Sequence, residues 1–558
     1  MKKKWWMERV GYEIYIKSFN DSNGDGIGDL RGIEEKLDYI HELGVDLIWI
    51  CPFYDSPMED EGYDVRDFFA VAQEYGTLAD FDRLLERAHD LGIRVIIDFV
   101  LNHTSDEHTW FRQSAADRRN PYRDYYIWHD GRIRDNERIE PTNWGSFFGG
   151  SAWQWHEKRQ QYYMKIFSSR MPDLNWNNPA VRKDMARVGK WWLDRGVDGF
   201  RIDAVAHLDR APLVDVEGGD GRYILDWKKF SNQPRVHEYL RELNEALFEP
   251  YDCLAIGEVG GEASISDGLK YASFDSGELD MVFNFDHNWC KVLSNGEETI
   301  DLPRLKRVFT SWQEAFKDEG WLPLNWLNHD QPRLLSHYGS KREPKRSAKT
   351  LATALYLMRG TPFIYQGEEI GMTNYPFRYR KEIRDVATVN RYRELASGTD
   401  MTEREIMERI APMSRDHART PMQWDSRPYA GFSTHPPWIG VNPNYERINV
   451  AKQQEDPESI LNYYKRLISL RRTGPDRDLV IYGDYQPIRS DEKVYAYRRT
   501  YRGKSMVVIC SFQDEMSTFD LSEYRIESIL IANGADVGND VAQLEPHGAI
   551  ALRVEVKT

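Results

Sequence analysis

The 558-residue sequence has few cysteines and no long apolar run. Its four cysteines lie far apart, without the close spacing of a metal site or a disulfide framework, so we expect reduced thiols. No stretch approaches the ~18 uninterrupted apolar residues of a membrane span, and the first residues lack the apolar core of an export signal. We therefore expect a cytoplasmic protein that does not associate with membranes.

Basic residues are fewer than acidic residues, and they form almost no clusters. The chain carries 90 Asp and Glu against 74 Lys and Arg, a formal net charge of −16, and its one basic run is Lys2-Lys3-Lys4. An acidic protein of this kind repels phosphate backbones, so nucleic acid is not an expected partner.

Short β-favouring segments alternate with helix-favouring segments up to about residue 370, which is typical of βα units and a parallel sheet. Segments such as 78–91 and 179–195 are predicted as intervening helices. Eight strands of this kind predict an α/β fold, a (β/α)8 TIM barrel whose loops after the strand carboxyl ends carry the chemistry. The predicted strands are residues 11–16, 45–50, 94–99, 197–203, 252–258, 281–285, 324–330 and 362–366.

Two connections are too long for simple loops. The aromatic-rich residues 105–172 predict a small domain inserted after the third strand, and the charged residues 371–424 predict a helical insertion after the eighth. Both would lie over the mouth of the barrel, which would itself comprise residues 1–104 and 173–480. Alternating apolar residues in 481–558 predict a separate C-terminal antiparallel β domain.

Four carboxylates stand at predicted strand ends: Asp98, Asp203, Glu258 and Asp330. Burying such charges is costly, so four of them predict one shared polar pocket. Arg201 should share a strand face with Asp203 and keep it ionised as a nucleophile, whereas the apolar surroundings of Glu258 favour a protonated general acid. The alternative is a structural ion pair between Arg201 and Asp203, with Glu258 exposed in a loop.

Two histidines also stand at predicted strand ends, His103 after the third strand and His329 in the seventh. A single histidine at such a place is usually structural. Two of them beside three carboxylates supply the paired donors and acceptors that a hydroxyl-rich ligand needs.

The motifs around these residues resemble the α-amylase superfamily of retaining α-glycoside hydrolases (glycoside hydrolase family 13), within it the oligo-1,6-glucosidase and α-glucosidase group. The resemblance covers essentially the whole chain. It implies that Asp203 is the nucleophile, Glu258 the general acid/base, and Asp330 a carboxylate that binds sugar hydroxyls. It also implies that His103, His329 and Arg201 contact the cleaved glucose. The motifs are Asp98-Phe-Val-Leu-Asn-His103, Gly199-Phe-Arg-Ile-Asp203, Ile256-Gly-Glu258, Asn328-His-Asp330, Gln366-Gly-Glu-Glu-Ile-Gly-Met372 and Arg419-Thr-Pro-Met-Gln-Trp424.

The same resemblance implies exo action, in which the pocket closes beyond one terminal glucose. Asp60, Tyr63 and Arg415 match the residues that make this closure in the α-glucosidase group, and an Asp60–Arg415 fork would bind the outer hydroxyls of that glucose. Phe148 and Phe167 match aromatic residues at the entrance, where apolar sugar faces stack. Retention of configuration would follow from two carboxyl groups about 5 Å apart.

Two positions depart from the pattern of the relatives. Met171 stands where they commonly carry Gln, and it cannot donate a hydrogen bond to a sugar hydroxyl. Ala204 follows the nucleophile where 1,6-preferring relatives typically have Val. The smaller side chain favours an α-1,4-linked, maltose-type substrate.

The segment 21–29 places oxygen ligands at alternate positions around a Gly26 turn and resembles the first nine positions of an EF-hand loop. Position twelve is Gly32 instead of the usual Glu. The segment predicts a structural Ca²⁺ site, the alternative being an acidic turn without metal, and no organic cofactor is expected. The expected ligands are Asp21, Asn23, Asp25, the Ile27 carbonyl and Asp29.

We therefore expect a retaining exo-α-glucosidase that releases glucose from the non-reducing ends of short α-linked gluco-oligosaccharides or disaccharides through a covalent glucosyl-enzyme. The alternatives on this scaffold are oligo-1,6-glucosidase, trehalose-6-phosphate hydrolase, and sucrose isomerase or glucosyl transferase. A phosphorylated substrate would need a Lys/Arg cluster near the entrance. Isomerases of this group carry an Arg-rich, aromatic stretch where this chain has residues 331–337, which favours hydrolysis. The barrel-like heavy chains of amino-acid transporters share the fold, but the complete carboxylate set argues against that role.

Overall fold

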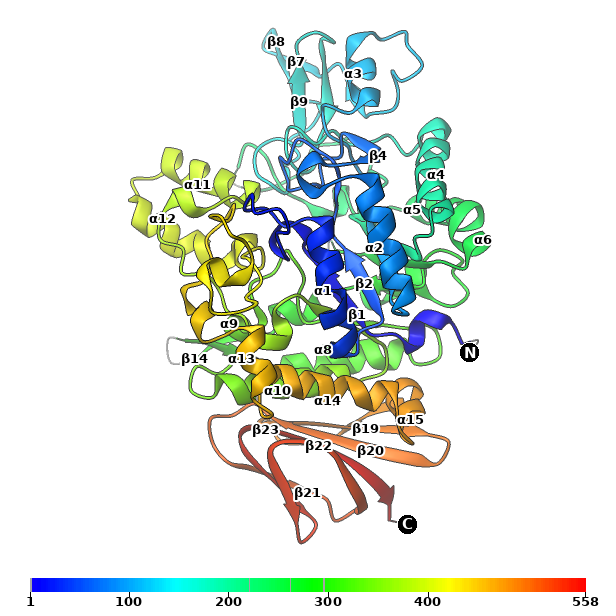
Figure 1. Cartoon of the computed structure of the whole chain (residues 1–558). Coiled ribbons are helices and arrows are strands. Elements are labelled where there is room, and N and C mark those ends of the chain that lie inside the picture. Colours follow the sequence, from blue (N-terminus) through cyan, green and yellow to red (C-terminus); the bar gives the residue numbers. More distant parts are fainter. Residues whose placement is uncertain (1–2, 220, 261, 295–296, 558) are drawn as a thin grey trace.

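The computed structural model describes residues 3–219, 221–260, 262–294 and 297–557, and a parallel eight-stranded sheet forms its centre (Figure 1). The strands follow the order β13-β12-β11-β5-β2-β1-β17-β16, and the two end strands contact each other, which closes the ring. The predicted (β/α)8 barrel is confirmed. The strands are β1 Gly11–Ile14, β2 Leu47–Ile50, β5 Arg94–Val100, β11 Gly199–Asp203, β12 Leu254–Glu258, β13 Met281–Phe283, β16 Pro323–Leu324 and β17 Thr361–Tyr365.

The seventh barrel strand is much shorter than predicted. β16 ends at Leu324, and residues 325–330, which we expected to extend it, are irregular. The Asn328 side chain accepts a hydrogen bond from the backbone N–H of Asp330 over 2.9 Å. This Asx turn turns the chain away from the sheet before the predicted end of the strand.

Helices surround the barrel, and polar residues cap their N-termini. Asp29 caps α1 (Leu30–Leu43), Thr77 forms a capping box at the start of α2 (Leu78–Asp90), and Asn178 caps α4 (Pro179–Asp194). The bounds of α2 and α4 agree with the predicted helices to within one residue. The other helices around the barrel are α5 Val236–Leu243, α6 Glu249–Tyr251, α7 Ile265–Ala272, α8 Leu302–Ala315, α9 Leu334–Tyr338, α10 Pro344–Tyr356, α13 Val450–Glu455 and α14 Ile460–Arg472.

A small sheet of order β6-β10-β9 follows β5 and projects from the barrel at the end opposite the C-terminal sheet (Figure 1). Trp144, Trp153 and Met164 form a core of its own together with Phe230. Aromatic and apolar residues at these positions explain why the segment folds as a module beside the barrel core. Its elements are α3 Thr109–Ala116, β6 Trp128–His129, β7 Arg132–Arg134, β8 Glu137–Ile139, β9 Trp153–His156 and β10 Gln161–Met164.

Two helices, α11 (Val386–Gly398) and α12 (Glu403–Ile410), follow β17 and pack on each other through Leu395, Ile406 and Ile410. They lie to one side of the barrel (Figure 1). Two further antiparallel strand pairs lie elsewhere in the chain, β3 Tyr54–Asp55 with β4 Asp67–Val71, and β14 Lys291–Ser294 with β15 Glu297–Ile300.

The C-terminal segment forms an antiparallel sheet of order β18-β19-β20-β23-β21, with β22 paired to β23. Val507, Ile509, Ile550 and Leu552 belong to its separate apolar core. The predicted C-terminal antiparallel β domain is confirmed. Its elements are α15 Arg477–Tyr482, β18 Asp484–Ile488, β19 Val494–Tyr501, β20 Lys504–Ser511, β21 Ser517–Asp520, β22 Tyr524–Gly538 and β23 Val541–Val556.

The thiols agree with what the spacing of the cysteines predicts. Cys51, Cys253, Cys290 and Cys510 are all buried and free. Among the residues that the structure describes, no helix combines the length and the apolar character needed to span a bilayer.

Candidate active site

The loops after the barrel strands and the inserted module enclose a cavity of about 810 Å³. Arg201 and His329 lie directly behind its wall, each with a side chain only 1% exposed. All the other predicted catalytic and substrate-binding residues line it: Asp60, Tyr63, His103, Phe148, Phe167, Asp203, Ala204, Glu258, Asp330 and Arg415.

Arg201 connects three carboxylates at the floor of the cavity. Its Nη1 donates to Asp98 Oδ1 over 2.6 Å and to Asp203 Oδ1 over 2.8 Å, and its Nη2 donates to Glu258 Oε2 over 2.5 Å. In the sheet Arg201 lies opposite Asp98 on one side and Ile256 on the other. Because side chains alternate along a strand, Arg201 and Asp203 share a face. Asp203 and Glu258 therefore converge on one shared cation.

The charge balance at Asp203 differs from our expectation. Burial raises the pKa of Asp203 well above its ordinary value, Arg201 acts in the opposite direction, and Glu258 and Asp98 add to the rise. A guanidinium divided among three carboxylates does not outweigh this burial. The Glu258 side chain is 22% exposed against 11% for Asp203. The more deeply buried member of the pair is thus Asp203, whereas we expected Glu258.

Asp98 does not line the cavity, contrary to the prediction that four carboxylates share one pocket. Its side chain is fully buried, and its Oδ2 accepts hydrogen bonds from Trp49 Nε1 over 2.8 Å and from the Tyr63 hydroxyl over 3.3 Å. Burial raises the pKa of Asp98 to about 6, against the effect of Arg201. Asp98 therefore supports Arg201 from behind the site.

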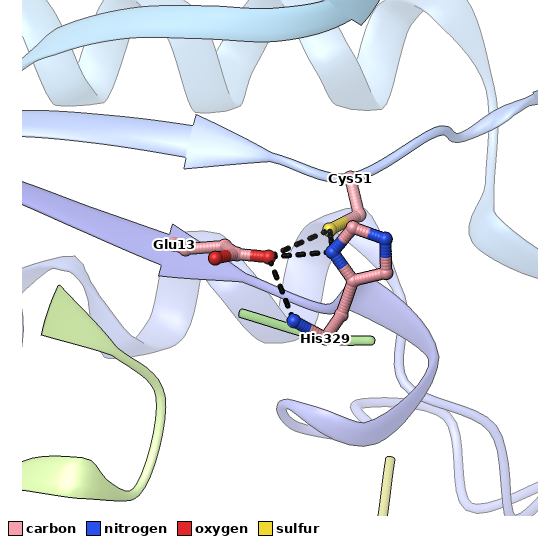
Figure 2. A group of neighbouring side chains, drawn as sticks. All are labelled: Glu13, Cys51 and His329. Atoms are coloured by element: carbon pink, nitrogen blue, oxygen red, sulfur yellow. Dashed lines mark hydrogen bonds and ion pairs between the residues drawn. The ribbon is translucent and has the colours of Figure 1, made fainter. Parts of the chain in front are cut away.

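His329 is held by Glu13, a residue of β1 that none of the sequence motifs includes (Figure 2). Glu13 Oε1 accepts hydrogen bonds from His329 Nδ1 over 2.7 Å and from its backbone N–H over 3.2 Å, and Cys51 Sγ lies 3.7 Å from the same oxygen. On its other side, His329 Nε2 lies 2.7 Å from the Tyr63 hydroxyl. The one sequence signal for Glu13 is a carboxylate within an otherwise apolar predicted strand.

Asp330 and His103 present contrasting groups to the cavity. Burial acts to raise the pKa of Asp330, but His329, Arg415 and Arg419 outweigh it and hold that pKa well below the ordinary value. Arg419 Nη2 donates to Asp330 Oδ1 over 2.7 Å. Burial lowers the pKa of His103 to about 3, and its buried Nε2 has no hydrogen-bond partner. Asp330 is thus an ionised acceptor, and His103 is a neutral imidazole with one free nitrogen.

Asp60 and Arg415 meet at the wall of the cavity, as the predicted fork requires. Arg415 Nη2 donates to Asp60 Oδ1 over 2.7 Å, and the guanidinium lies 4.9 Å from the centre of the Phe148 ring. Asp385 Oδ1 accepts from the same nitrogen over 2.6 Å. Sequence reasoning missed Asp385, because an Asp before a helix reads only as an N-cap.

The residue after Asp203 has an unusual backbone. Ala204 adopts a left-handed conformation, with φ 48° and ψ 33°, and its N–H lies 3.3 Å from Glu258 Oε2.

Met171 lines the cavity and is 1% exposed, so it offers an apolar surface there. Further lining residues lie on loops without periodic patterns, so the sequence did not reveal them: Phe147, His207, Trp227, Val259, Gly260, Glu262, Ala263, Asn284, Phe285, Asp286, Trp289, Asn328 and Gln331.

The predicted calcium loop has the oxygen-rich donor set that this hard cation prefers. Asp21 Oδ1 accepts from Asn23 and Gly24 N–H groups, and Asp25 Oδ1 accepts from Ile27 N–H over 2.9 Å, so these carboxylates already shape the turn. Asp29 differs, because its Oδ1 caps α1 by accepting from Gly32 N over 2.7 Å. The donor types suit Ca²⁺, but the carboxylates of Asp21, Asp25 and Asp29 do not gather within 4.8 Å of one another, and Asp29 is divided between the loop and the helix.

Gly32 explains why this loop lacks the twelfth ligand of an EF-hand. A Cβ atom built on Gly32 would lie 1.9 Å from the Asn20 carbonyl oxygen. No side chain fits there unless the backbone moves. In the described part of the chain, the one group of three potential metal ligands within 4.8 Å of one another is Glu13, Cys51 and His329, already joined by hydrogen bonds.

Comparison with known proteins places this arrangement in a family. Residues 13–479 match the family described as "Alpha amylase, catalytic domain". An oligo-1,6-glucosidase of Parageobacillus thermoglucosidasius is 44% identical over 563 residues, which cover 99% of this chain and 98% of that protein.

Two solved structures are similar over almost their whole length. Trehalose-6-phosphate hydrolase of Bacillus licheniformis is 42% identical with a TM-score of 0.90, covering 99% of this chain and 100% of its own. Isomaltulose synthase of Erwinia rhapontici NX5 is 37% identical with a TM-score of 0.92, covering 100% of both chains. From its barrel, its converging carboxylates and these matches, the chain belongs to the α-amylase family and is a glycoside hydrolase.

Proposed function

We propose that the protein is a retaining exo-α-glucosidase that cleaves glucose from the non-reducing ends of short, uncharged α-glucosides. The observation that carries this proposal is the convergence of Asp203 and Glu258 on Arg201 at the floor of one cavity. A double-displacement glycosidase requires two carboxyl groups that flank the scissile bond at short range, one to attack the anomeric carbon and one to protonate the departing oxygen.

Each carboxylate takes a separate role in the proposed reaction. Asp203 attacks the anomeric carbon and forms a covalent glucosyl-enzyme, while Glu258 gives its proton to the departing glycosidic oxygen. Glu258 then accepts a proton from the water that releases glucose. Asp330, ionised beside Arg419, accepts hydrogen bonds from sugar hydroxyls, and the free Nε2 of neutral His103 provides another contact.

The rim of the cavity supports exo action. Asp60 and Arg415 are 2.7 Å apart and present a charged fork to the outer hydroxyls of one glucose. Charge-assisted hydrogen bonds of this kind are strong and directional. A second sugar beyond this fork would have to displace a guanidinium that is paired with Asp60 and whose side chain is 14% exposed.

The charge of the cavity favours an uncharged substrate over trehalose 6-phosphate. Among the described lining residues Arg415 is the one Lys or Arg, and it already donates to Asp60 and Asp385. Glu262 and Asp286 also line the cavity. A phosphate dianion entering this lining meets like charges without a free cation, which costs binding energy.

Hydrolysis is favoured over sucrose isomerisation by the segment after Asp330. Gln331 lines the cavity, whereas Arg333 is 1% exposed and donates to the backbone carbonyls of Gln366 and Ala418. Arg333 thus supports the fold and takes no place at the site. We further propose, from the small Ala204, that α-1,4 linkages are preferred to α-1,6 linkages.

We also propose that segment 21–29 binds a structural Ca²⁺ ion and that the protein works in the cytoplasm, where its four buried free thiols suit a reducing environment. Added Ca²⁺ should raise the thermal unfolding midpoint of the chelator-treated protein, and Asp25→Ala should remove that rise. An unchanged midpoint in the unsubstituted protein would remove the calcium proposal.

The main test is a substrate panel measured as initial rates: p-nitrophenyl α-glucoside, maltose, isomaltose, sucrose and trehalose 6-phosphate. We expect cleavage of the first two at the highest rates, with α-glucose as the first product by NMR, and no turnover by Asp203→Asn. Initial β-glucose, or full activity in Asp203→Asn, would overturn the proposed mechanism.

A further inference from the structure

We propose that Asp385, at the start of α11, is a positioning residue that holds the Arg415 guanidinium in the orientation with which it closes the cavity beyond one glucose. This inference rests on the proposed function, because Arg415 meets a sugar only if the cavity binds one. Asp385 acts through Arg415 and does not itself line the cavity.

Asp385 fixes the guanidinium at two nitrogens. Its Oδ1 accepts from Arg415 Nε over 2.8 Å and from Nη2 over 2.6 Å. Asp60, by contrast, is bonded through Nη2 alone, over 2.7 Å. Asp330 adds one longer contact, 3.4 Å from Arg415 Nη1. Without Asp385 the planar group would keep one short and one long contact, whereas two short bonds from one side fix its plane. The orientation of Arg415 at the cavity therefore depends on Asp385 more than on Asp60.

Asp385 is itself immobilised by the first turn of α11. Its Oδ2 accepts from Thr388 N over 3.2 Å and from Thr388 Oγ1 over 2.5 Å, and its Oδ1 also accepts from Ala387 N over 3.2 Å. The backbone N–H of Asp385 donates to Asp416 Oδ2 over 3.0 Å. Because Asp416 directly follows Arg415, the two segments hold each other in both directions.

The electrostatics agree with this role. Asp385 is 2% exposed. Burial acts to raise the pKa of Asp385, but Arg415 and Arg419 outweigh it, and the pKa lies below the ordinary value. An ionised carboxylate at this depth is stable because it is paired with the guanidinium on one side and the helix N-terminus on the other.

The same helix also holds the part of the inserted module that lies next to Arg415. Asn390 Nδ2 donates to the Phe148 carbonyl over 3.1 Å, and the Phe148 ring lies below the Arg415 guanidinium. Glu394 lies against Gly149, where an added Cβ would be 2.3 Å from Glu394 Oε1. Helix α11 thus connects Arg415 with the inserted module. Its N-cap residue, Asp385, is therefore well placed to set the geometry of the cavity mouth.

The competing interpretation is that Asp385 serves only as a helix cap. The two roles have different chemical requirements, because Ser caps a helix about as well as Asp, whereas its short, uncharged side chain cannot accept from both Arg415 nitrogens. Asp301 is a matched control, since its side chain caps α8 by accepting from Arg304 N over 3.0 Å and it does not line the cavity.

The first experiment measures kcat and KM of Asp385→Ser and Asp301→Ser with p-nitrophenyl α-glucoside, together with their thermal unfolding midpoints. A misoriented binding group typically costs up to about 100-fold, so we expect KM of Asp385→Ser to rise at least about ten-fold, with a smaller fall in kcat. Asp301→Ser should keep both constants. The midpoint should fall further in Asp385→Ser than in Asp301→Ser, because only the former leaves a guanidinium without its buried partner, so the constants are measured well below both midpoints. An unchanged KM in Asp385→Ser would overturn the proposal.

The second experiment asks whether Asp385 acts through Arg415. In an Arg415→Ala background, Asp385→Ser should have no further effect on KM, because the group that it positions is gone. Full additivity of the two substitutions would contradict the inference.

A crystal structure of Asp385→Ser separates this inference from the proposed function. Arg415 should no longer lie in its place against Asp60, and an unmoved guanidinium would overturn the positioning role even if no α-glucoside is cleaved. Failure of the unsubstituted enzyme to cleave any α-glucoside would overturn the proposed function alone.

Discussion

The backbone N–H of Ala204 lies 3.3 Å from Glu258 Oε2, so the residue after the proposed nucleophile also contacts the proposed acid/base. Ala204 has a left-handed conformation, with φ 48° and ψ 33°, and its N–H meets Glu258 at the end of β12. Position 204 therefore influences both the space beside the leaving group and the placement of Glu258.

Two substitutions of Ala204 should test separately the space beside the leaving group and the strain of the backbone. Ala204→Val narrows the cavity and should raise the ratio of isomaltose to maltose turnover, but a β-branched residue at φ 48° is strained, so stability should fall by about 1–2 kcal/mol. Ala204→Gly relieves that strain and should keep the thermal unfolding midpoint or raise it. Equal linkage ratios in the Val variant and the unsubstituted enzyme would refute the linkage argument.

Loss of the Asp60–Arg415 fork should weaken exo action. Hydrogen bonds to charged groups contribute about 1.5–3 kcal/mol, so Asp60→Ala should lower kcat/KM for maltose by about 10- to 100-fold. The opened rim should also let maltotriose bind in more than one register. Maltotriose labelled at its reducing end should then give labelled glucose and unlabelled maltose among the early products, whereas removal of one terminal glucose gives labelled maltose. Asp106→Ala, a change of an acidic residue that does not line the cavity, is the control. Undiminished glucose release by Asp60→Ala would remove Asp60 from the binding site.

Glu13 should matter as a hydrogen-bond acceptor behind His329. Glu13→Met leaves the buried Nδ1 and backbone N–H of His329 without a partner, a cost of about 1–3 kcal/mol, so kcat/KM should fall by about 10- to 100-fold. Glu13→Gln retains a carbonyl acceptor and should keep most of the activity. Equal losses in both variants would show that the negative charge, and not the acceptor, is what His329 requires.

Glu368 should make stability depend on pH. This carboxyl is buried between the hydroxyls of Tyr356 and Tyr464, and burial raises its pKa from the ordinary 4.5 to about 8. Because the folded state holds the proton more tightly, the stabilisation is complete below pH 4.5 and is lost as the pH rises toward about 8. Between these limits the unfolding midpoint should fall more steeply in the unsubstituted protein than in Glu368→Gln. Parallel curves for the two proteins would contradict this linkage.

The barrel and its carboxylates were predictable from sequence because buried parallel strands are apolar runs with abrupt ends. Asp203 and Glu258 are the last residues of β11 and β12, as expected. The same signal failed at β16, since Trp326 and Leu327 are apolar and buried although they lie outside the strand. An apolar segment indicates that its side chains are buried. Amino-acid composition does not show whether the backbone of that segment forms hydrogen bonds with a neighbouring strand.

The partners of the site residues were not predictable in this way. Glu13 is 316 positions from His329, and Asp385 is 30 positions from Arg415. The Glu13–His329 contact exists because the barrel closes, and the Asp385–Arg415 contact exists because the segments before α11 and after α12 pack together. In the sequence, Glu13 is an isolated charge in a strand and Asp385 is a helix cap, and neither pattern points to a distant imidazole or guanidinium.

The guanidinium of Arg201 joins Asp98 to Asp203, and the charge of Asp98 adds to the rise in the pKa of Asp203. Replacing Asp98, which never meets the sugar, by Asn removes that charge and with it a charged competitor for Arg201. The pKa of Asp203 should consequently fall, and the acid side of the pH–rate profile should move to lower pH.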